Sequence, residues 1–425
     1  MKKRKMYLRF SLSLVVAFCF VFMFGYASFA ADVPKVKVGV VLPLTGPPAS
    51  MGIGGKQALE VYFDYINENG GIKSLGGAQI EMVLADSAAQ PDVGVNQAER
   101  LIHKENVQVL IGCYQSSVTL PVSSLAQRYK IPMISFAGNS DKILMRGNDW
   151  IIRPGPWASG TAYSRLEAVK VLNDLKGVKN NKIGILYVDD EWGQAGEKAI
   201  KTQAPLFGLE VVVSQPYPHK IADFTSIITN FKKHDIVAIL VNGYGPETLL
   251  FLQSRYQMDM GGGIFCISGV HDPGFLPSAG ITARYLFCNV SSGDWLIPHK
   301  TKEVLKIFDQ YEKKYPKDCP HFGGGEGEFF GFMCGQALYA ALEKAGSLDN
   351  KSIMDALMSL KIPAKDMVCP FAIEVSEDFL GMKGQNQKGV LPIEQYDEKI
   401  VSRMVSPLEK GYDPVWPVPK PSEWK

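Results

Sequence analysis

The sequence predicts an α/β protein with two doubly wound lobes, and two observations support this prediction. Short apolar runs alternate with Gly-, Pro- and Ser-rich turns and with longer stretches whose apolar residues lie three and four positions apart. This βα alternation predicts parallel sheets that carry helices on both faces. It begins at Val36 and begins again after Arg153. Two lobes are also expected because the chain has 425 residues, whereas single cores stop growing at about 250 to 300 residues.

Each element follows from its own pattern. A strand is expected at 36–42, and the helix after it ends at Asn69-Gly70, where glycine is a common helix stop. Further strands are expected at 80–84, 107–111, 131–135, 182–188, 210–214, 236–241 and 264–268, with helices near 95–104 and 118–129. The later patterns predict a helix over 328–345, a hairpin of 390–396 with 399–405, and an extended Pro-rich tail from 413 that wraps the surface.

The first 30 residues have the layout of a secretory signal peptide. Five basic residues and no acidic one accompany an apolar run from Phe10 to Tyr26. Small residues at Ser28 and Ala30 predict cleavage between Ala30 and Ala31. A membrane anchor is the alternative, because the run approaches the roughly 20 residues of a spanning helix. The cleavage-like ending and the globular pattern that follows favour secretion.

The charge balance argues against a nucleic-acid partner. The chain has 45 Lys and Arg against 43 Asp and Glu, and five of the basic residues lie in the leader. Without the leader, 40 basic residues stand against 43 acidic ones, a net charge near −3. Nucleic-acid binding needs a basic surface instead.

The sequence lacks several common enzyme motifs. It contains no G-x-S-x-G, H-E-x-x-H, G-x-x-x-x-G-K-[ST] or G-x-G-x-x-G. This argues against the common hydrolases, zinc proteases, NTPases and dinucleotide enzymes. The glycine-rich segment 323–327 is interpreted as a flexible turn before a helix, because no strand directly precedes it. No catalytic residue and no cofactor are therefore predicted, and the protein is not expected to be an enzyme.

Histidine and cysteine spacing predicts no metal site. The six histidines are interpreted as surface or loop residues: 103, 219, 234, 271, 299 and 321. None of the six cysteines after the leader forms a C-x-x-C pair. Cys319 and Cys369 lie in loop-like segments and are the better candidates for a disulfide, although spacing gives no pairing. Small buried side chains are expected at the others: Cys113, Cys266, Cys288 and Cys334.

Two polar loops follow neighbouring strands in the first half of the chain. One runs from Gly112 to Ser117 and the other from Ser135 to Ser140. Ligands of open α/β sheets bind outside the carboxyl ends of strands, where helix N-termini present free N–H groups. Hydroxyl and amide side chains beside such groups can hold a carboxylate. Helix capping by Ser116, Ser117 or Asn139 is the alternative, but two such loops together favour a binding site.

Several ordered motifs closely resemble the periplasmic leucine/isoleucine/valine-binding protein family. They lie at 40–47, 66–72, 112–119, 187–193, 223–226 and 242–244, and the resemblance covers nearly all of the chain after the leader. It implies two Rossmann-like lobes, joined by three crossovers near Arg153, Asn289 and Phe371, that close over a ligand. The implied division is 1–30 as signal peptide, 31–153 with 290–371 as the first lobe, and 154–289 with 372–425 as the second lobe and tail.

The resemblance also implies where a ligand is held. In that family the loops matching Ser116 and matching Gly138 with Asn139 bind the ligand carboxylate, and aromatic residues matching Trp192 and Tyr244 come from the second lobe. The predicted ligand contacts are Met51, Gln115, Ser116, Ser117, Gly138, Asn139, Trp192, Tyr244 and Ser268. Aromatic side chains suit an apolar or aromatic ligand tail.

This sequence departs from the family pattern at two positions. Ser268 stands where the branched-chain amino acid binders have a carboxylate, and Met51 stands where the family often has an aromatic residue. An unpaired buried ligand ammonium would cost several kcal/mol. We therefore expect either that Asp272, Glu247 or Asp189 substitutes, or that the ligand has no α-amino group.

The resemblance implies a role in import. The expected function is capture of an amino acid or related small carboxylate with an apolar or aromatic tail, followed by delivery to the membrane permease of an ABC importer. The implied protein is a periplasmic monomer. Two alternatives remain open: a ligand-sensing receptor module, and a binder of an acid or amide without an α-amino group.

Overall fold

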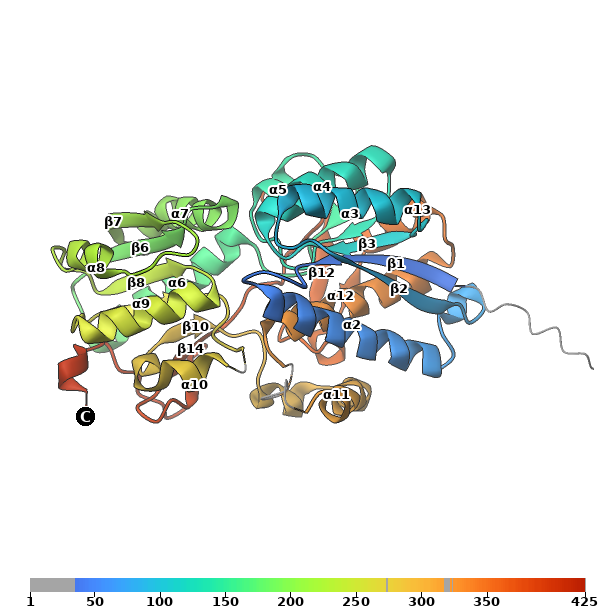
Figure 1. Ribbon diagram of the computed structural model, residues 1–425. Helices are drawn as coiled ribbons and strands as arrows, with labels where there is room; N and C mark the ends of the chain where they lie inside the picture. The colour runs from blue at the N-terminus through green and yellow to red at the C-terminus, as the bar shows by residue number, and fades with distance from the viewer. Residues whose placement is uncertain (1–34, 273, 317–321, 323, 425) are drawn as a thin grey trace, which may run out of the picture.

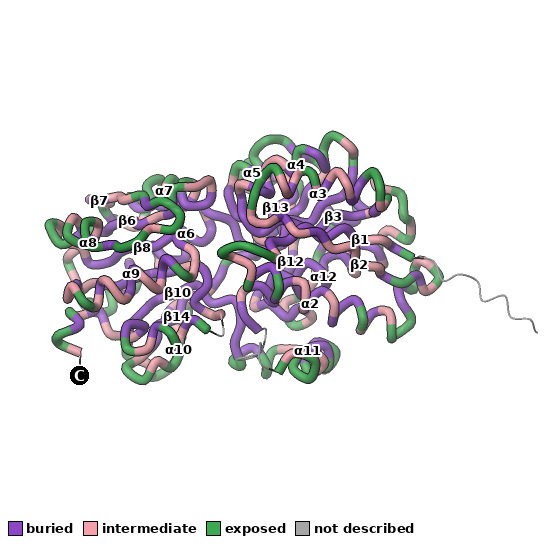
Figure 2. Tube along the Cα trace, in the orientation of Figure 1, coloured by how far each residue is buried: buried purple, intermediate pink, exposed green. Residues whose placement is uncertain are grey.

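Two lobes lie side by side in the computed structural model, which describes residues 35–424 except 273, 317–321 and 323 (Figure 1). Each lobe has a largely parallel sheet between layers of helices, which confirms the predicted α/β fold. Buried residues follow the sheets, and the outer helix faces are exposed (Figure 2). The expected leader, Cys319 and His321 lie outside the described residues. None of the described helices is long and apolar enough to cross a membrane.

The first lobe is built on five parallel strands in the order β2-β1-β3-β4-β5. They are β1 (Lys35–Leu42), β2 (Gln79–Asp86), β3 (Val109–Gly112), β4 (Met133–Ile134) and β5 (Ile151–Ile152). One face packs on α2 (Ala49–Glu68), α11 (Lys302–Lys314), α12 (Glu326–Ala345) and α13 (Asn350–Met358), and the other on α3 (Pro91–His103), α4 (Ser116–Tyr129) and α5 (Lys142–Met145). Val40 and Val41 face opposite cores, as alternation along a strand requires.

The second lobe has seven strands in the order β15-β14-β10-β9-β8-β6-β7. They are β6 (Lys182–Val188), β7 (Glu210–Tyr217), β8 (Ala238–Asn242), β9 (Gly263–Cys266), β10 (Phe287–Asn289), β14 (Ile393–Tyr396) and β15 (Ser402–Ser406). β14 pairs antiparallel with both β10 and β15, and the other strands of this sheet pair in parallel. The helices α6 (Ala158–Lys176) and α7 (Glu191–Gln203) cover one face, and α8 (Thr225–Phe231), α9 (Gly245–Gln257) and α10 (Phe275–Ala279) cover the other.

The structure confirms the predicted hairpin and tail. The hairpin turns through Asp397, whose side chain accepts hydrogen bonds from the amides of Lys399 and Val401. The tail runs over the second lobe and is anchored by Trp416, whose ring lies 5.7 Å from that of Phe287. The strand expected at 131–135 is shorter, because only two residues of β4 pair with β3 and β5.

The segment around the expected third crossover forms a small sheet. A small antiparallel sheet of β11 (Lys361–Ile362), β12 (Ile373–Ser376) and β13 (Gln385–Asn386) follows α13. Ile373 and Val375 of β12 belong to the core of the first lobe, and the amide of Arg153 donates to the carbonyl of Gly384 at 2.8 Å. Residues 373 and 375 thus pack with the first lobe, and the position of the third crossover stays a prediction.

Cys369 corrects the disulfide expectation. Its side chain is fully buried and its thiol is free, donating to the carbonyl of Phe371 at 3.3 Å. The loop-like sequence around it was misleading, because the segment packs on α12: the amide of Val368 donates to the side-chain oxygen of Gln336 at 3.0 Å. Cys369 thus belongs to the core of the first lobe.

Candidate functional site

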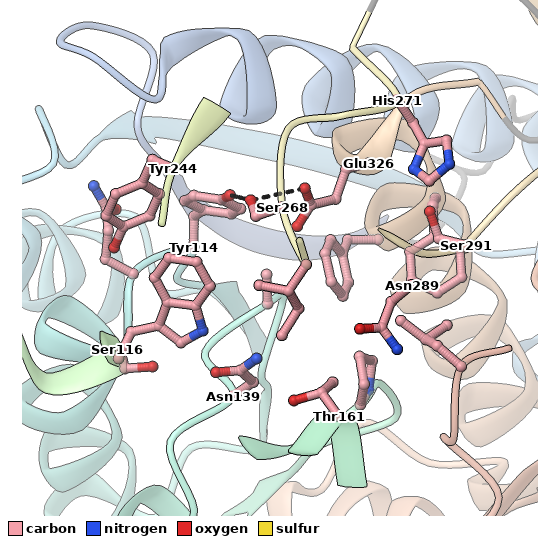
Figure 3. A pocket seen from close by; sticks show the side chains of 18 residues that line it. Tyr114, Ser116, Asn139, Thr161, Tyr244, Ser268, His271, Asn289, Ser291 and Glu326 are labelled. Atoms are coloured by element: carbon pink, nitrogen blue, oxygen red, sulfur yellow. Dashed lines mark hydrogen bonds between the residues drawn. The ribbon is translucent and has the colours of Figure 1, made fainter. Parts of the chain in front are cut away.

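A cavity lies between the lobes and takes its lining from both. We call it the interlobe cavity (Figure 3). The first lobe contributes the loops after β3 and β4 and the start of α12, and the second lobe contributes the segments after β6, β8, β9 and β10. The polar lining residues are Tyr114, Gln115, Ser116, Asn139, Thr161, Tyr244, Ser268, His271, Asn289, Ser291 and Glu326. This is the edge at which open α/β sheets bind ligands.

One end of the cavity is formed by the two polar loops of the first lobe. Because β3 and β4 are parallel neighbours, their exits lie together, and the amide of Ser140 donates to the hydroxyl of Ser116 at 3.1 Å. Ser116 is the first residue of α4, and Gln115 stands at the N-cap position without a side-chain capping hydrogen bond. The first amides of a helix have no intrahelical acceptor and carry partial positive charge. This end can therefore bind an anion such as a carboxylate.

The side chain of Arg153 anchors the second of these loops. This side chain is 1% exposed and donates to the carbonyl oxygens of Ser140 at 2.8 Å and Gly138 at 3.3 Å. It also donates to the side-chain oxygen of Gln385 at 2.6 Å. A Cβ at Gly138 would lie 2.5 Å from the hydroxyl of Thr119, so this position needs glycine. The loop that carries Asn139 is thus held rigidly beside the first crossover.

Aromatic side chains form a wall of the cavity. The ring of Tyr244 lies 4.7 Å from that of Trp192 and 6.3 Å from that of Tyr114. The Tyr244 hydroxyl donates to Asp190 at 3.0 Å, and Asp190 also caps α7 by accepting from the amide of Gly193 at 2.9 Å. Asp190, which caps α7, therefore also positions the Tyr244 ring. The aromatic wall offers an apolar surface to a ligand tail.

The opposite end of the cavity contains a partly buried carboxylate. Glu326, the first residue of α12, accepts from the Ser268 hydroxyl at 2.9 Å and from the Gly269 amide at 2.8 Å. The hydroxyl oxygens of Ser268 and Tyr114 lie 3.0 Å apart and share a hydrogen bond. Burial raises the pKa of Glu326 to about 7, although the Gly269 amide opposes the shift. Figure 3 shows Glu326 and Ser116 on opposite sides of the cavity.

Unpaired acceptors surround the space between these ends. Among the described residues that line the cavity, Gln115, Asn139 and Asn289 each have a buried amide oxygen that accepts no hydrogen bond from the protein. A buried polar group without a partner costs about 1–3 kcal/mol. A bound molecule with hydrogen-bond donors would remove that cost, so these oxygens favour a ligand with N–H or O–H groups.

The structure brings together six of the nine predicted contact residues. Gln115, Ser116, Asn139, Trp192, Tyr244 and Ser268 all line the interlobe cavity. Met51 and Ser117 instead line a neighbouring cavity, which shares Tyr114, Gln115 and Tyr244 with the first. Gly138 lines neither cavity but shapes the loop beside it.

None of the three acids expected to replace the family carboxylate lines the interlobe cavity. Asp272 and Glu247 line the neighbouring cavity, and Asp272 accepts from the Ser50 hydroxyl at 3.2 Å. Asp189 accepts from the Gln194 side chain at 3.0 Å on the surface. The carboxylate beside Ser268 comes instead from Glu326, more than fifty positions later in the chain.

The glycine-rich segment offered a signal for Glu326. The sequence analysis interpreted 323–327 as a turn before a helix, and α12 does begin there. A Cβ at Gly327 would lie 2.4 Å from the carbonyl oxygen of Met51, so glycine allows the start of α12 to approach α2 closely. An acidic residue in the first turn of a helix, next to a glycine of this kind, was the sequence feature that could have indicated Glu326. Thr161, Asn289 and Ser291 gave no comparable signal.

Known proteins resemble this chain over most of its length. A family model described as periplasmic binding protein matches residues 35–379. The Leu/Ile/Val-binding protein homolog 8 of Brucella suis is 24% identical over 388 residues, which cover 88% of this chain and 92% of that protein.

Two solved structures are similar in fold. A branched-chain amino acid transporter substrate-binding protein from Streptococcus pneumoniae, in complex with isoleucine, has a TM-score of 0.68 at 20% identity, covering 87% of this chain and 99% of that one. A solute-binding protein of an ABC transporter from R. palustris, in complex with benzoate, has a TM-score of 0.67 at 19% identity, covering 91% and 97%. With the match over most of its length, this chain belongs to the periplasmic binding protein family.

Proposed function

We propose that this protein captures an α-amino acid with an apolar or aromatic side chain and delivers it to an ABC importer. The observation that carries the proposal is the pairing of two ends in one cavity. An anion-binding end lies at Ser116 and Asn139, and a partly buried carboxylate lies at Glu326. An α-amino acid carries the complementary charges on adjacent atoms of one small molecule.

Glu326 supports the amine half of this proposal. A buried carboxylate is stabilised by a cation at hydrogen-bonding distance. Among the charged groups that act on Glu326, Asp272 raises its pKa and His271 lowers it, and burial has the largest effect. A ligand ammonium beside Glu326 would favour its ionised form. Ser268 then acts as a hydroxyl that orients the Glu326 carboxylate and does not itself supply charge.

The walls of the cavity support an apolar or aromatic tail. Trp192, Tyr244, Phe329, Phe330 and Leu391 all line it. Cavities that bind small molecules are mostly apolar, with a few polar groups that fix orientation. A leucine-like or phenylalanine-like side chain would bury its apolar surface against these residues.

Closure of the lobes supports a role in capture. The lobes touch beside the cavity, where the Ser140 hydroxyl donates to Glu191 at 2.8 Å and Lys142 pairs with Glu191 at 2.9 Å. A ligand that contacts both lobes stabilises the closed form. The closed monomer would then dock on a membrane permease in the periplasm, after cleavage of the leader behind Ala30.

A second candidate is an acid without an α-amino group. The pKa of Glu326, about 7, leaves a protonated fraction at neutral pH that can donate a hydrogen bond to an uncharged ligand oxygen. The benzoate complex of the similar R. palustris protein belongs to this ligand class. Such a ligand would be a carboxylate with a hydroxyl or carbonyl oxygen facing Glu326.

A thermal-shift screen of refolded, ligand-stripped protein tests the proposal. Leucine, isoleucine, valine and phenylalanine are compared with benzoate and phenylacetate, because a ligand that binds only the native state raises the unfolding temperature. We expect dose-dependent shifts from one or more of the amino acids and none from the two acids. Shifts from the acids alone would replace the first candidate with the second.

A further inference from the structure

We propose that His271, Cys288 and Glu394 form a metal site for Zn²⁺ or a similar thiophilic divalent cation, in the second lobe beside the interlobe cavity. One ligand atom of each residue lies within 4.8 Å of the others. The three side chains come from the loop after β9, from β10 and from β14. Imidazole, thiolate and carboxylate are the three side-chain types that Zn²⁺ binds in proteins. The proposal is independent of the identity of the solute.

The distance between Cys288 and His271 suits a tetrahedral cation, whereas Glu394 lies closer to both than it would with a cation bound. The Sγ of Cys288 lies 3.8 Å from the Nε2 of His271. Zinc bonds of about 2.3 Å to sulfur and 2.0–2.1 Å to nitrogen, at tetrahedral angles, put these two atoms roughly 3.6 Å apart. Glu394 Oε1 lies 2.7 Å from His271 Nε2 and 3.1 Å from Cys288 Sγ. A small rotation of the carboxylate would open the space between them.

The sheet holds two of the three ligands rigidly. Cys288 and Glu394 are direct partners in the antiparallel pairing of β10 with β14. Their residues are 1% and 2% exposed, and the Ser402 hydroxyl donates to the other oxygen of Glu394. A hydrogen bond to a ligating carboxylate orients it for the metal. Ligands on paired strands are positioned more precisely than ligands on loops.

A third cavity gives the cluster access to solvent. His271 and Glu394 line it together with Ser402, Tyr396 and Asp294. A water from this cavity would complete four-coordination. On binding, the cation would displace the thiol proton of Cys288 to solvent, and the proton that His271 Nε2 donates to Glu394 would leave for solvent or for Nδ1 of the same ring. The cation would join the loop after β9 to the hairpin of β14 and β15.

The alternative is a hydrogen-bonded cluster without a metal function. In the structure, the His271 ring and the Cys288 thiol both contact Glu394, and this contact alone can stabilise the buried carboxylate. The two possibilities differ in their response to Co²⁺, which gives a thiolate-to-metal charge-transfer absorption only when sulfur is a ligand.

Tag-free protein treated with chelator and then titrated with Zn²⁺ and Co²⁺ tests the proposal. We expect one equivalent of Zn²⁺ by calorimetry, a rise in the unfolding temperature, and a thiolate charge-transfer band with Co²⁺. Absence of that band in the wild-type protein overturns the proposal without any variant.

Variants sharpen the assignment. Cys288→Ser and Glu394→Gln should each weaken Zn²⁺ binding at least tenfold. Cys266→Ser is the matched control, because Cys266 is a buried free cysteine that pairs with Cys288 on the neighbouring strand and lies outside the cluster. Zn²⁺ binding that is unchanged in Cys288→Ser, or lost equally in Cys266→Ser, contradicts the site. The Co²⁺ spectrum of wild-type protein decides the matter if a variant does not fold.

Discussion

The two ends of the interlobe cavity are built differently. The anion-binding end lies within the first lobe, where Ser116 and Asn139 follow neighbouring strands and Arg153 holds the second loop. The carboxylate end crosses the lobes, because Glu326 of the first lobe bonds to Ser268 and Gly269 of the second. If the lobes open, the contacts of the first end stay within one lobe, whereas those of the second end are broken. Closure would then select for the ligand amine, while the first lobe alone selects for the carboxylate.

Glu326→Gln should cause the largest loss of affinity for amino acids, because it removes the charge at the carboxylate end. Losing one partner of a buried charge pair costs about 2–5 kcal/mol, so affinity for amino acids should fall by at least about 30-fold. Binding of a carboxylate without an amine should change little. Calorimetry with both ligand types measures this.

Glu247→Gln is the matched control for that experiment. Glu247 is a buried acid, but it lines the neighbouring cavity. If amino acid binding were lost in Glu247→Gln and kept in Glu326→Gln, the partner of the ligand ammonium would have to be assigned to the neighbouring cavity.

Arg153→Met should destabilise the loop at the anion-binding end and so lower the free energy of unfolding. The change leaves the carbonyls of Gly138 and Ser140 and the side chain of Gln385 without their donor. A buried unpaired acceptor costs about 1–3 kcal/mol, so the unfolding free energy should fall by at least about 2 kcal/mol. Urea denaturation measures the loss. Arg146→Met is the exposed control, and equal effects of the two changes would contradict the anchoring role of Arg153.

The affinity for amino acids should depend on pH through Glu326. Its pKa is raised from 4.5 to about 7 in the free protein, and an ammonium needs the ionised form. Affinity should therefore fall roughly tenfold per pH unit below 7. His271 and Asp272 also act on this carboxylate, so calorimetry from pH 5.5 to 8 should include Glu326→Gln. A pH dependence that survives in this variant would assign the titration to another group.

The same shift predicts the opposite trend for stability without ligand. Between pH 4.5 and about 7, the folded protein holds a proton on Glu326 that the unfolded chain has released. The contribution of Glu326 to the unfolding free energy should therefore decrease as pH rises through this window. Comparing wild type with Glu326→Gln by urea denaturation isolates that contribution, and parallel pH profiles would show that the pKa of Glu326 is not raised.

Tyr244→Phe should have the smallest effect. The ring remains against Trp192, and only the 3.0 Å hydrogen bond to Asp190 is lost. A hydrogen bond contributes about 0.5–1.5 kcal/mol, so affinity should fall roughly fivefold. Tyr256→Phe, on the far side of the second lobe against Trp424, is the control for fluorescence titration. An unchanged affinity in Tyr244→Phe would show that Asp190 does not position the wall.

The fold and the meeting of the two polar loops could be predicted from sequence because their signals are local. The strand exits before Ser116 and Asn139 follow from short apolar runs and polar turns. The pairing of Ser268 with Glu326 is not local, because it joins the loop after β9 to the start of α12 across the lobes. His271 was expected on the surface or in a loop. It does lie in a loop, but its side chain is only 8% exposed, because it contacts Glu394 of a hairpin that is distant in sequence.

The most direct test of the central claim compares two ligands that differ by one amino group. Calorimetry of wild-type protein with phenylalanine and 3-phenylpropanoate, or with leucine and 4-methylpentanoate, isolates the amine. We expect the better-fitting amino acid to bind at least about 30-fold more tightly than its deaminated counterpart, as for a charge pair inside a closed cavity. Equal affinities, or tighter binding of the deaminated acid, would contradict the assignment of Glu326 as the partner of a ligand ammonium.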